Sequence, residues 1–207
     1  MKTQLAVLGL ILAQPCIGSP FINLAFDEPD LTGSLTPIDP GGPLEGNTSE
    51  ILRGWSLTVD GQPKLRMEYA PPGTGGGSLA YLVNNPAGSL LGPHSLTLFS
   101  PFPSTPEIRV GQIGTIPAEA TGLWIGSAGY IEGFVNGIKI GEVKPELGSQ
   151  VVLDVTRFAG QEVSLEFVLR YGGSARFDIF GFTPIPEPST WALFGVGATA
   201  MFLFARR

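Results

Sequence analysis

The chain has 207 residues, with 12 basic and 18 acidic side chains and a formal net charge of −6. An acidic chain does not provide the basic patch that nucleic-acid recognition usually requires, so no nucleic-acid partner is expected. Cys16 is the only cysteine and His94 the only histidine. A disulfide within the chain and a zinc site built from several His or Cys ligands are therefore both excluded.

The first 18 residues have the pattern of a secretory signal peptide. Lys2 gives a positive start, residues 5–13 form an apolar core, and Cys16 to Gly18 precede the expected cleavage after Gly18. An N-terminal membrane anchor is the alternative. No lipid is expected on Cys16, because Pro15 stands where a small Gly or Ala would be required. If residues 1–18 and 187–207 are removed, the remaining chain holds 17 acidic and 9 basic residues and has a formal charge of −8.

The body, residues 19–183, alternates short apolar runs with turns rich in glycine and proline, of which the whole chain has 29 and 19. This pattern predicts an all-β, jelly-roll-like antiparallel β-sandwich. No amphipathic helix is expected. The predicted strands are residues 21–26, 52–59, 65–69, 78–83, 95–99, 107–113, 123–127, 131–135, 138–143, 151–155, 163–171 and 176–182.

Two dipeptides predict tight hairpins within this body. Asn136-Gly137 and Asp60-Gly61 are the pairs that type I′ turns favour, because both central residues need a positive φ. The Asp60-Gly61 turn is expected to join residues 52–59 to residues 65–69. Residues 31–50 are expected to form a long loop.

The C-terminal two dozen residues have three parts in a fixed order. Pro186-Glu187-Pro188 lies in a proline-rich stretch that stays extended, because proline disfavours helix at the residue before it. An uncharged apolar run follows, predicted as a transmembrane helix over about residues 190–205. Arg206 and Arg207 end the chain and favour the cytoplasmic side of a membrane. A buried C-terminal helix and an ordinary tail anchor are the alternatives.

This arrangement of residues 184–207 closely resembles the PEP-CTERM sorting signal of Gram-negative bacteria. The resemblance implies a membrane partner, the protease-transpeptidase called exosortase. It also implies export, a transient stay in the inner membrane, and delivery to the cell surface or the exopolysaccharide matrix. It leaves the chemistry of the body open.

The second half of the body has a further resemblance. Residues 114–118, 154–161 and 177–182 look like corresponding segments of galactose-binding-like jelly-roll domains of surface proteins. In such domains the first and last strands lie side by side, and acidic residues there often hold a structural Ca²⁺. The resemblance makes Asp27, Glu28 and Asp178 the candidate calcium ligands, because oxygen donors suit this ion. The alternative is a solvated acidic turn and no cofactor.

Catalysis is not expected, so no catalytic residue is assigned. His94 lies in a Pro/Gly loop without a Gly-x-Ser-x-Gly motif, and a surface position is the simpler interpretation. Residues 73–78 are glycine-rich but lack the lysine and the strand-to-helix context of a phosphate-binding loop. The carboxylates that a glycosidase could pair are expected to be solvated on polar strand faces; they are Glu107, Glu119, Glu132, Glu166 and Asp178.

Carbohydrate binding is the main alternative to a purely structural role. Exposed aromatic rings would provide the stacking surface for sugars. Trp55 and Trp124 lie within apolar runs and are expected in the core, which leaves Tyr130, beside a glycine-rich turn, as the candidate ligand-binding residue. The sequence thus predicts an exported, exosortase-sorted, non-catalytic β-sandwich, or alternatively a module that binds an extracellular glycan.

Overall fold

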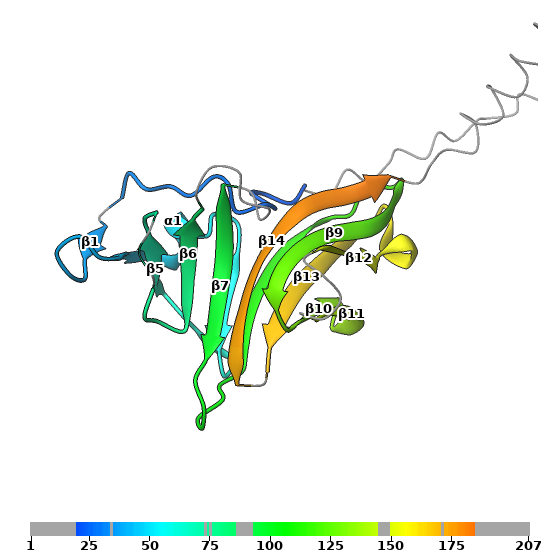
Figure 1. The fold of residues 1–207 in the computed structure, drawn as a ribbon. Coiled ribbons are helices and arrows are strands. Elements are labelled where there is room, and N and C mark those ends of the chain that lie inside the picture. The colour runs from blue at the N-terminus through cyan, green and yellow to red at the C-terminus, as the bar shows by residue number, and fades with distance from the viewer. Residues whose placement is uncertain are drawn as a thin grey trace, which may run out of the picture.

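The computed structural model describes residues 20–33, 35–72, 74, 76–85, 93–144, 150–170 and 172–184. Within them the chain forms two β-sheets packed face to face, which confirms the predicted β-sandwich (Figure 1). The predicted signal peptide and the predicted C-terminal helix lie outside the described residues. Among the described residues, none of the helices has the length and apolar character needed to cross a membrane.

The larger sheet has eight strands within the described residues, in the order β1-β2-β5-β6-β7-β14-β9-β12. Figure 1 shows β14 and β9 as long, curved neighbours, while β1 and β2 lie at the far end of the sheet. The strands are β1 (Thr36–Pro37), β2 (Leu44–Asn47), β5 (Arg66–Ala70), β6 (Ala80–Asn84), β7 (His94–Ser100), β9 (Ala120–Gly129), β12 (Gln150–Asp154) and β14 (Gly173–Pro184).

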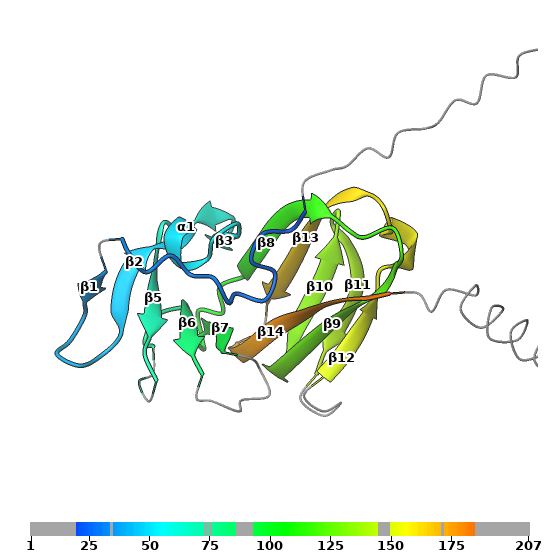
Figure 2. The ribbon, with the colours of Figure 1, turned by 90° about the horizontal axis from the view of Figure 1, so that it is seen from above.

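The smaller sheet has six strands within the described residues, in the order β11-β10-β13-β8-β3-β4. Figure 2 shows β10, β11 and β13 facing β9, β12 and β14 across the sandwich. The strands are β3 (Ser56–Val59), β4 (Gln62–Pro63), β8 (Ile108–Thr115), β10 (Ile131–Val135), β11 (Ile138–Val143) and β13 (Glu162–Leu169). Within the described residues, two short helices connect strands: α1 (Thr48–Ile51) and the 3₁₀ turn η2 (Thr156–Phe158).

Both predicted tight turns are present. Asp60 and Gly61 have φ values of 49° and 74°, and Asn136 and Gly137 have values of 51° and 74°. The Asn136-Gly137 turn joins β10 to β11 as predicted. The Asp60-Gly61 turn joins β3 to the short β4. The next strand, β5, pairs with β2 in the other sheet. The predicted pairing of residues 52–59 with residues 65–69 is therefore wrong.

One further prediction of secondary structure is wrong. Residues 31–50 contain β1, β2 and most of α1 instead of a plain loop. The adjacent β5 and β6 run parallel, unlike the other strand pairs of the two sheets among the described residues.

Residues 21–26, predicted as the first strand, form turns instead. Asn23 and Phe26 have positive φ values of 50° and 58°. The Gln112 side chain provides the hydrogen bonds that a neighbouring strand would otherwise supply, because it accepts from Ile22 N at 2.8 Å and donates to Ile22 O at 2.7 Å. The segment therefore acts as a strap across the end of the sandwich.

Four aromatic side chains form the centre of the core. Phe26 from the strap packs against Trp55 at 5.2 Å and Phe177 at 5.6 Å between ring centroids. Phe167 completes the group, 5.2 Å from Phe177 and 6.3 Å from Trp55. Since all four side chains are buried, the strap contributes directly to the hydrophobic stabilisation of both sheets.

Candidate functional site

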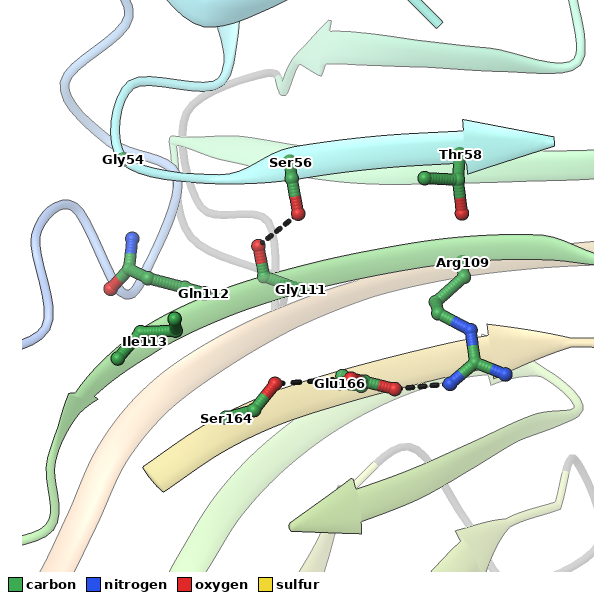
Figure 3. Close-up of a pocket in the computed structure, with 9 residues that line it drawn as sticks. All are labelled: Gly54, Ser56, Thr58, Arg109, Gly111, Gln112, Ile113, Ser164 and Glu166. Atoms are coloured by element: carbon green, nitrogen blue, oxygen red, sulfur yellow. Dashed lines mark hydrogen bonds and ion pairs between the residues drawn. The ribbon is translucent and has the colours of Figure 1, made fainter. Parts of the chain in front are cut away.

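A hollow of about 430 Å³ lies on the outer face of the six-stranded sheet. Three neighbouring strands form it: β3 on one side, β8 as the floor and β13 on the other side (Figure 3). Its volume lies within the roughly 300–1,000 Å³ typical of small-molecule sites. The lining residues are Gly54, Ser56, Thr58, Arg109, Gly111, Gln112, Ile113, Ser164 and Glu166.

The hollow exists because β8 has a glycine at an outward position. Val110 packs into the core, and in a strand alternate residues face opposite sides, so Gly111 faces outward like Arg109 and Ile113. A Cβ at Gly111 would lie 3.1 Å from Glu166 Cγ and 3.7 Å from Ser56 Oγ. Any other residue would therefore begin to fill the floor of the hollow.

The rim of the hollow is polar, whereas one wall is apolar. The Ser56 hydroxyl donates to the Gly111 carbonyl at 2.9 Å, and the Ser164 hydroxyl donates to Glu166 Oε1 at 3.0 Å (Figure 3). The Thr58 hydroxyl has no hydrogen-bond partner among the described residues. Ile113 is 69% exposed and forms the apolar wall.

Arg109 is the cation of the hollow, and two carboxylates hold it. Its Nη2 donates to Glu107 Oε1 at 2.9 Å, and its Nη1 pairs with Glu166. Partial burial acts to lower the pKa of Arg109, but the hydrogen bonds and charges of Glu107 and Glu166 outweigh it and raise the pKa. Arg109 is thus a fixed, neutralised cation instead of a free anion-binding group.

The charged network continues across the same face toward β11. Arg170 joins Glu107 at 3.1 Å to Glu132 at 3.5 Å. Lys139 then bridges Glu132 at 2.5 Å and Glu142 at 2.8 Å. The four carboxylates of this network, those of Glu107, Glu132, Glu142 and Glu166, are therefore paired with cations.

Tyr130, the predicted ligand-binding residue, belongs to this network instead of the hollow. Its hydroxyl donates to Glu142 at 2.9 Å and lies 3.2 Å from Glu132. Burial, the hydrogen bond to Glu142 and the charge of Glu132 together raise the pKa of Tyr130 to about 12. Its hydroxyl therefore stays protonated at physiological pH.

The structure brings two of the three predicted calcium ligands near each other. Asp178 is 1% exposed on β14, and its Oδ1 accepts the Ile179 backbone N–H at 2.7 Å. Burial raises the pKa of Asp178 to about 8, and the charge of Asp27 raises it further while the Ile179 hydrogen bond opposes the shift. Glu28 instead faces Arg53, at 3.9 Å.

The assignment of Asp27, Glu28 and Asp178 as calcium ligands stays a prediction. Across the described residues, no three or more His, Cys, Asp or Glu side chains converge into a group that could hold a metal ion.

His94 lies beside Asp27. Its Nδ1 is 3.9 Å from Asp27 Oδ1, and its ring is 6.2 Å from that of Tyr69. Burial lowers the pKa of His94 despite the charge of Asp27, so the ring is neutral at physiological pH. His94 begins β7 and is partly buried, so the expectation of a surface loop residue is wrong.

The glycine-rich loop uses its described backbone in internal contacts. The Gly77 N–H donates to Glu68 Oε2 at 2.8 Å. Gly73 and Gly75 of this loop lie outside the described residues. The same is true of the sorting residues Pro186, Glu187, Pro188, Arg206 and Arg207.

The two body tryptophans have opposite environments. Trp55 is in the core as predicted, and its Nε1 donates to Asn23 O at 3.0 Å. Trp124 is 41% exposed on the outer face of the larger sheet, 5.2 Å from the Phe180 ring, so its predicted core position is wrong. Its place between the buried Leu123 and Ile125 is the period-two signal that could have identified it.

Comparison with solved structures gives two remote likenesses. A β-D-glucuronidase from Dictyoglomus thermophilum aligns with 15% identity and a TM-score of 0.26 over 38% of this chain and 21% of its own. An arabinose-bound α-L-arabinofuranosidase aligns with 14% identity and a TM-score of 0.39 over 81% of this chain and 26% of its own. The chain thus spans about a quarter or less of the length of these proteins.

Comparison with curated protein sequences finds no match. The PEP-CTERM protein-sorting motif, by contrast, matches residues 184–207, which begin at the last residue of β14. The chain therefore contains a β-sandwich body and, from its last described residue onward, a PEP-CTERM sorting motif.

Proposed function

We propose that this chain is an exported, non-catalytic β-sandwich protein that an exosortase sorts to the cell surface or the exopolysaccharide matrix. The observation that carries the proposal is the sorting motif at residues 184–207, joined without a linker to β14. Such a motif directs export through an exosortase at the membrane. The body is then the part that the sorting reaction delivers.

The charged groups of the body support a role without catalysis. Glu107 and Glu166 share Arg109, and Glu132 pairs with Lys139 and Arg170. A glycosidase requires two carboxyl groups that are free to act on substrate. Side chains already committed to ion pairs serve to stabilise the sheet face instead.

A carbohydrate-binding module is the second candidate function. The polar hollow over Gly111 and the exposed ring of Trp124 favour it, because sugar sites combine hydrogen-bonding groups with apolar or aromatic surfaces. The two candidates are compatible, since a protein of the polysaccharide matrix can bind the polymer that surrounds it.

The test of the proposed function is the intact mass of the protein recovered from native cells and from their medium. We expect a product that begins near Ser19 and ends near Pro186, with or without added carbohydrate mass. A Glu187→Ala variant is expected to keep residues 187–207 and to accumulate in the inner membrane. If the wild-type protein keeps Trp191 to Arg207 and stays in that membrane, the chain is a plain tail-anchored protein.

A further inference from the structure

We propose that the hollow over Gly111 binds a neutral segment of an extracellular glycan and discriminates against acidic sugars. The inference rests on the carbohydrate-binding candidate above and specifies its location and its ligand class. The site is on the outer face of the smaller sheet, away from Trp124 on the outer face of the larger sheet.

The surface chemistry of the hollow matches the two sides of a sugar ring. A pyranose presents hydroxyl groups around its edge and C–H groups on its faces. The hydroxyls of Ser56, Thr58 and Ser164 surround the floor, and that of Thr58 is uncommitted among the described residues. The exposed Ile113 side chain provides the apolar surface against which C–H groups can pack.

The charges of the hollow determine which sugars fit. Arg109 and Arg170 are matched by Glu107 and Glu166, so these four residues have a net charge of zero. Within the hollow, an acidic sugar would meet the Glu166 carboxylate, and the one lining cation, Arg109, is already paired with Glu166 and with Glu107 outside the lining. A neutral sugar can accept hydrogen bonds from the remaining guanidinium N–H groups of Arg109, which has five donors in all.

The floor of the hollow is rigid and open. Its polar groups come from three adjacent strands, which fix their positions better than loops would. The groove follows β8 from Gly54 and Gln112 at one end to Thr58 and Arg109 at the other (Figure 3). An elongated, open site suits an internal segment of a polysaccharide, because the polymer can enter and leave at the two ends.

The test uses the full-length protein in a detergent without a sugar headgroup. The probes are an array of neutral oligosaccharides, built from glucose, galactose, mannose or arabinose, and oligouronates of matched length. We expect binding to at least one neutral series and none to the oligouronates. The affinity for the best neutral probe is then measured by calorimetry for each variant.

Two variants alter the hollow without removing a buried side chain. Gly111→Val fills the floor, and Ile113→Ala removes the exposed wall. Each is expected to weaken binding of the best neutral probe about tenfold or more, a typical loss when a central contact is removed. Ile138→Ala is the matched control, because Ile138 is 47% exposed on the edge strand β11 of the same sheet and should leave binding unchanged.

The outcomes separate this inference from the proposed function. Binding that Trp124→Ala abolishes and the hollow variants leave intact would overturn the inference while keeping a glycan-binding body. Preference for oligouronates would overturn it as well, as would absence of binding to every neutral probe. None of these results affects two-ended processing and export, which the intact-mass measurement tests separately. Equal melting temperatures of Ile113→Ala and wild type show that the comparison reports binding and not unfolding.

Discussion

Phe21 and Phe182 pack against each other at one end of the sandwich, with ring centroids 5.7 Å apart. The Phe21 ring lies directly over Gly114 of β8, where a Cβ would come within 2.6 Å of it. Phe182 is two residues before the end of β14. The first and last described segments of the body, which contain Phe21 and Phe182, therefore lie side by side at one end of the sandwich.

The Phe21–Phe182 contact should stabilise the fold cooperatively. Each side chain is half-buried, so we expect Phe21→Ala and Phe182→Ala each to lower the free energy of unfolding by about 1–3 kcal/mol. The double variant should lose less than the sum by about 0.5–1.5 kcal/mol, the value typical of an aromatic pair. Chemical denaturation of the four proteins gives the coupling energy, and strict additivity would show that the rings do not interact.

Gln112 should be the side chain that holds the strap in place. It is 6% exposed, and replacing it with Leu would leave the N and O atoms of Ile22 without their partners. We expect a loss of about 1–3 kcal/mol per unsatisfied group. Gln112→Glu should lose less, because the carboxylate still accepts from Ile22 N.

The measurement for the strap is amide hydrogen exchange at Ile22, combined with denaturant unfolding. Faster exchange at Ile22 in Gln112→Leu, beyond the change expected from global stability, would show local release of the strap. Unchanged exchange in that variant would mean that Phe26 alone anchors the segment.

Asp178 should make the protein less stable as the pH rises from about 4 to about 8. Its pKa is about 8 in the folded state against the ordinary value of 3.8 for an aspartate, so the folded state retains a proton that the unfolded state releases. Stability from this group is fully present below the unfolded pKa and is lost as the pH rises through the folded pKa. The slope within the window is about 1.4 kcal/mol per pH unit.

Asp178→Asn isolates this effect, because asparagine does not ionise and its Oδ1 can still accept the Ile179 N–H. We expect the melting temperature of the variant to rise relative to wild type between pH 4 and pH 8. Asp27 and His94 are present in both proteins, so their titration contributes to the melting temperature of each and is not the difference that is measured. A difference that stays constant over this range would mean that Asp178 is ionised in the folded protein.

Calcium should not stabilise the body at neutral pH. Asp178 retains its proton there and Glu28 faces Arg53, so the predicted ligand set is not assembled. Thermal melts at pH 7 with about millimolar CaCl₂ and with chelator are expected to coincide, at concentrations relevant to extracellular calcium sites. A calcium-dependent rise that Asp178→Ala abolishes would restore the calcium hypothesis.

Local sequence patterns determined much of the sheet structure. Asn136-Gly137 requires positive φ at two successive residues, and the flanking alternation has a period of two, so residues 131–143 could be assigned as a hairpin without further information. The same reasoning located most of the strands from β6 onward. The sorting signal was also readable, because its three parts lie in one continuous segment whose order carries the information.

The tertiary structure alone decided where non-local partners meet. Residues 21–26 alternate like a strand, yet the Gln112 side chain, 90 residues away, satisfies Ile22 and leaves the segment outside both sheets. The hollow over Gly111 requires β3, β8 and β13 to be adjacent, which no local pattern specifies. The environment of Asp178 likewise depends on burial that arises only when the strap approaches β14. Periodicity and turn chemistry act over a few residues, whereas strand order and desolvation depend on the whole packed chain.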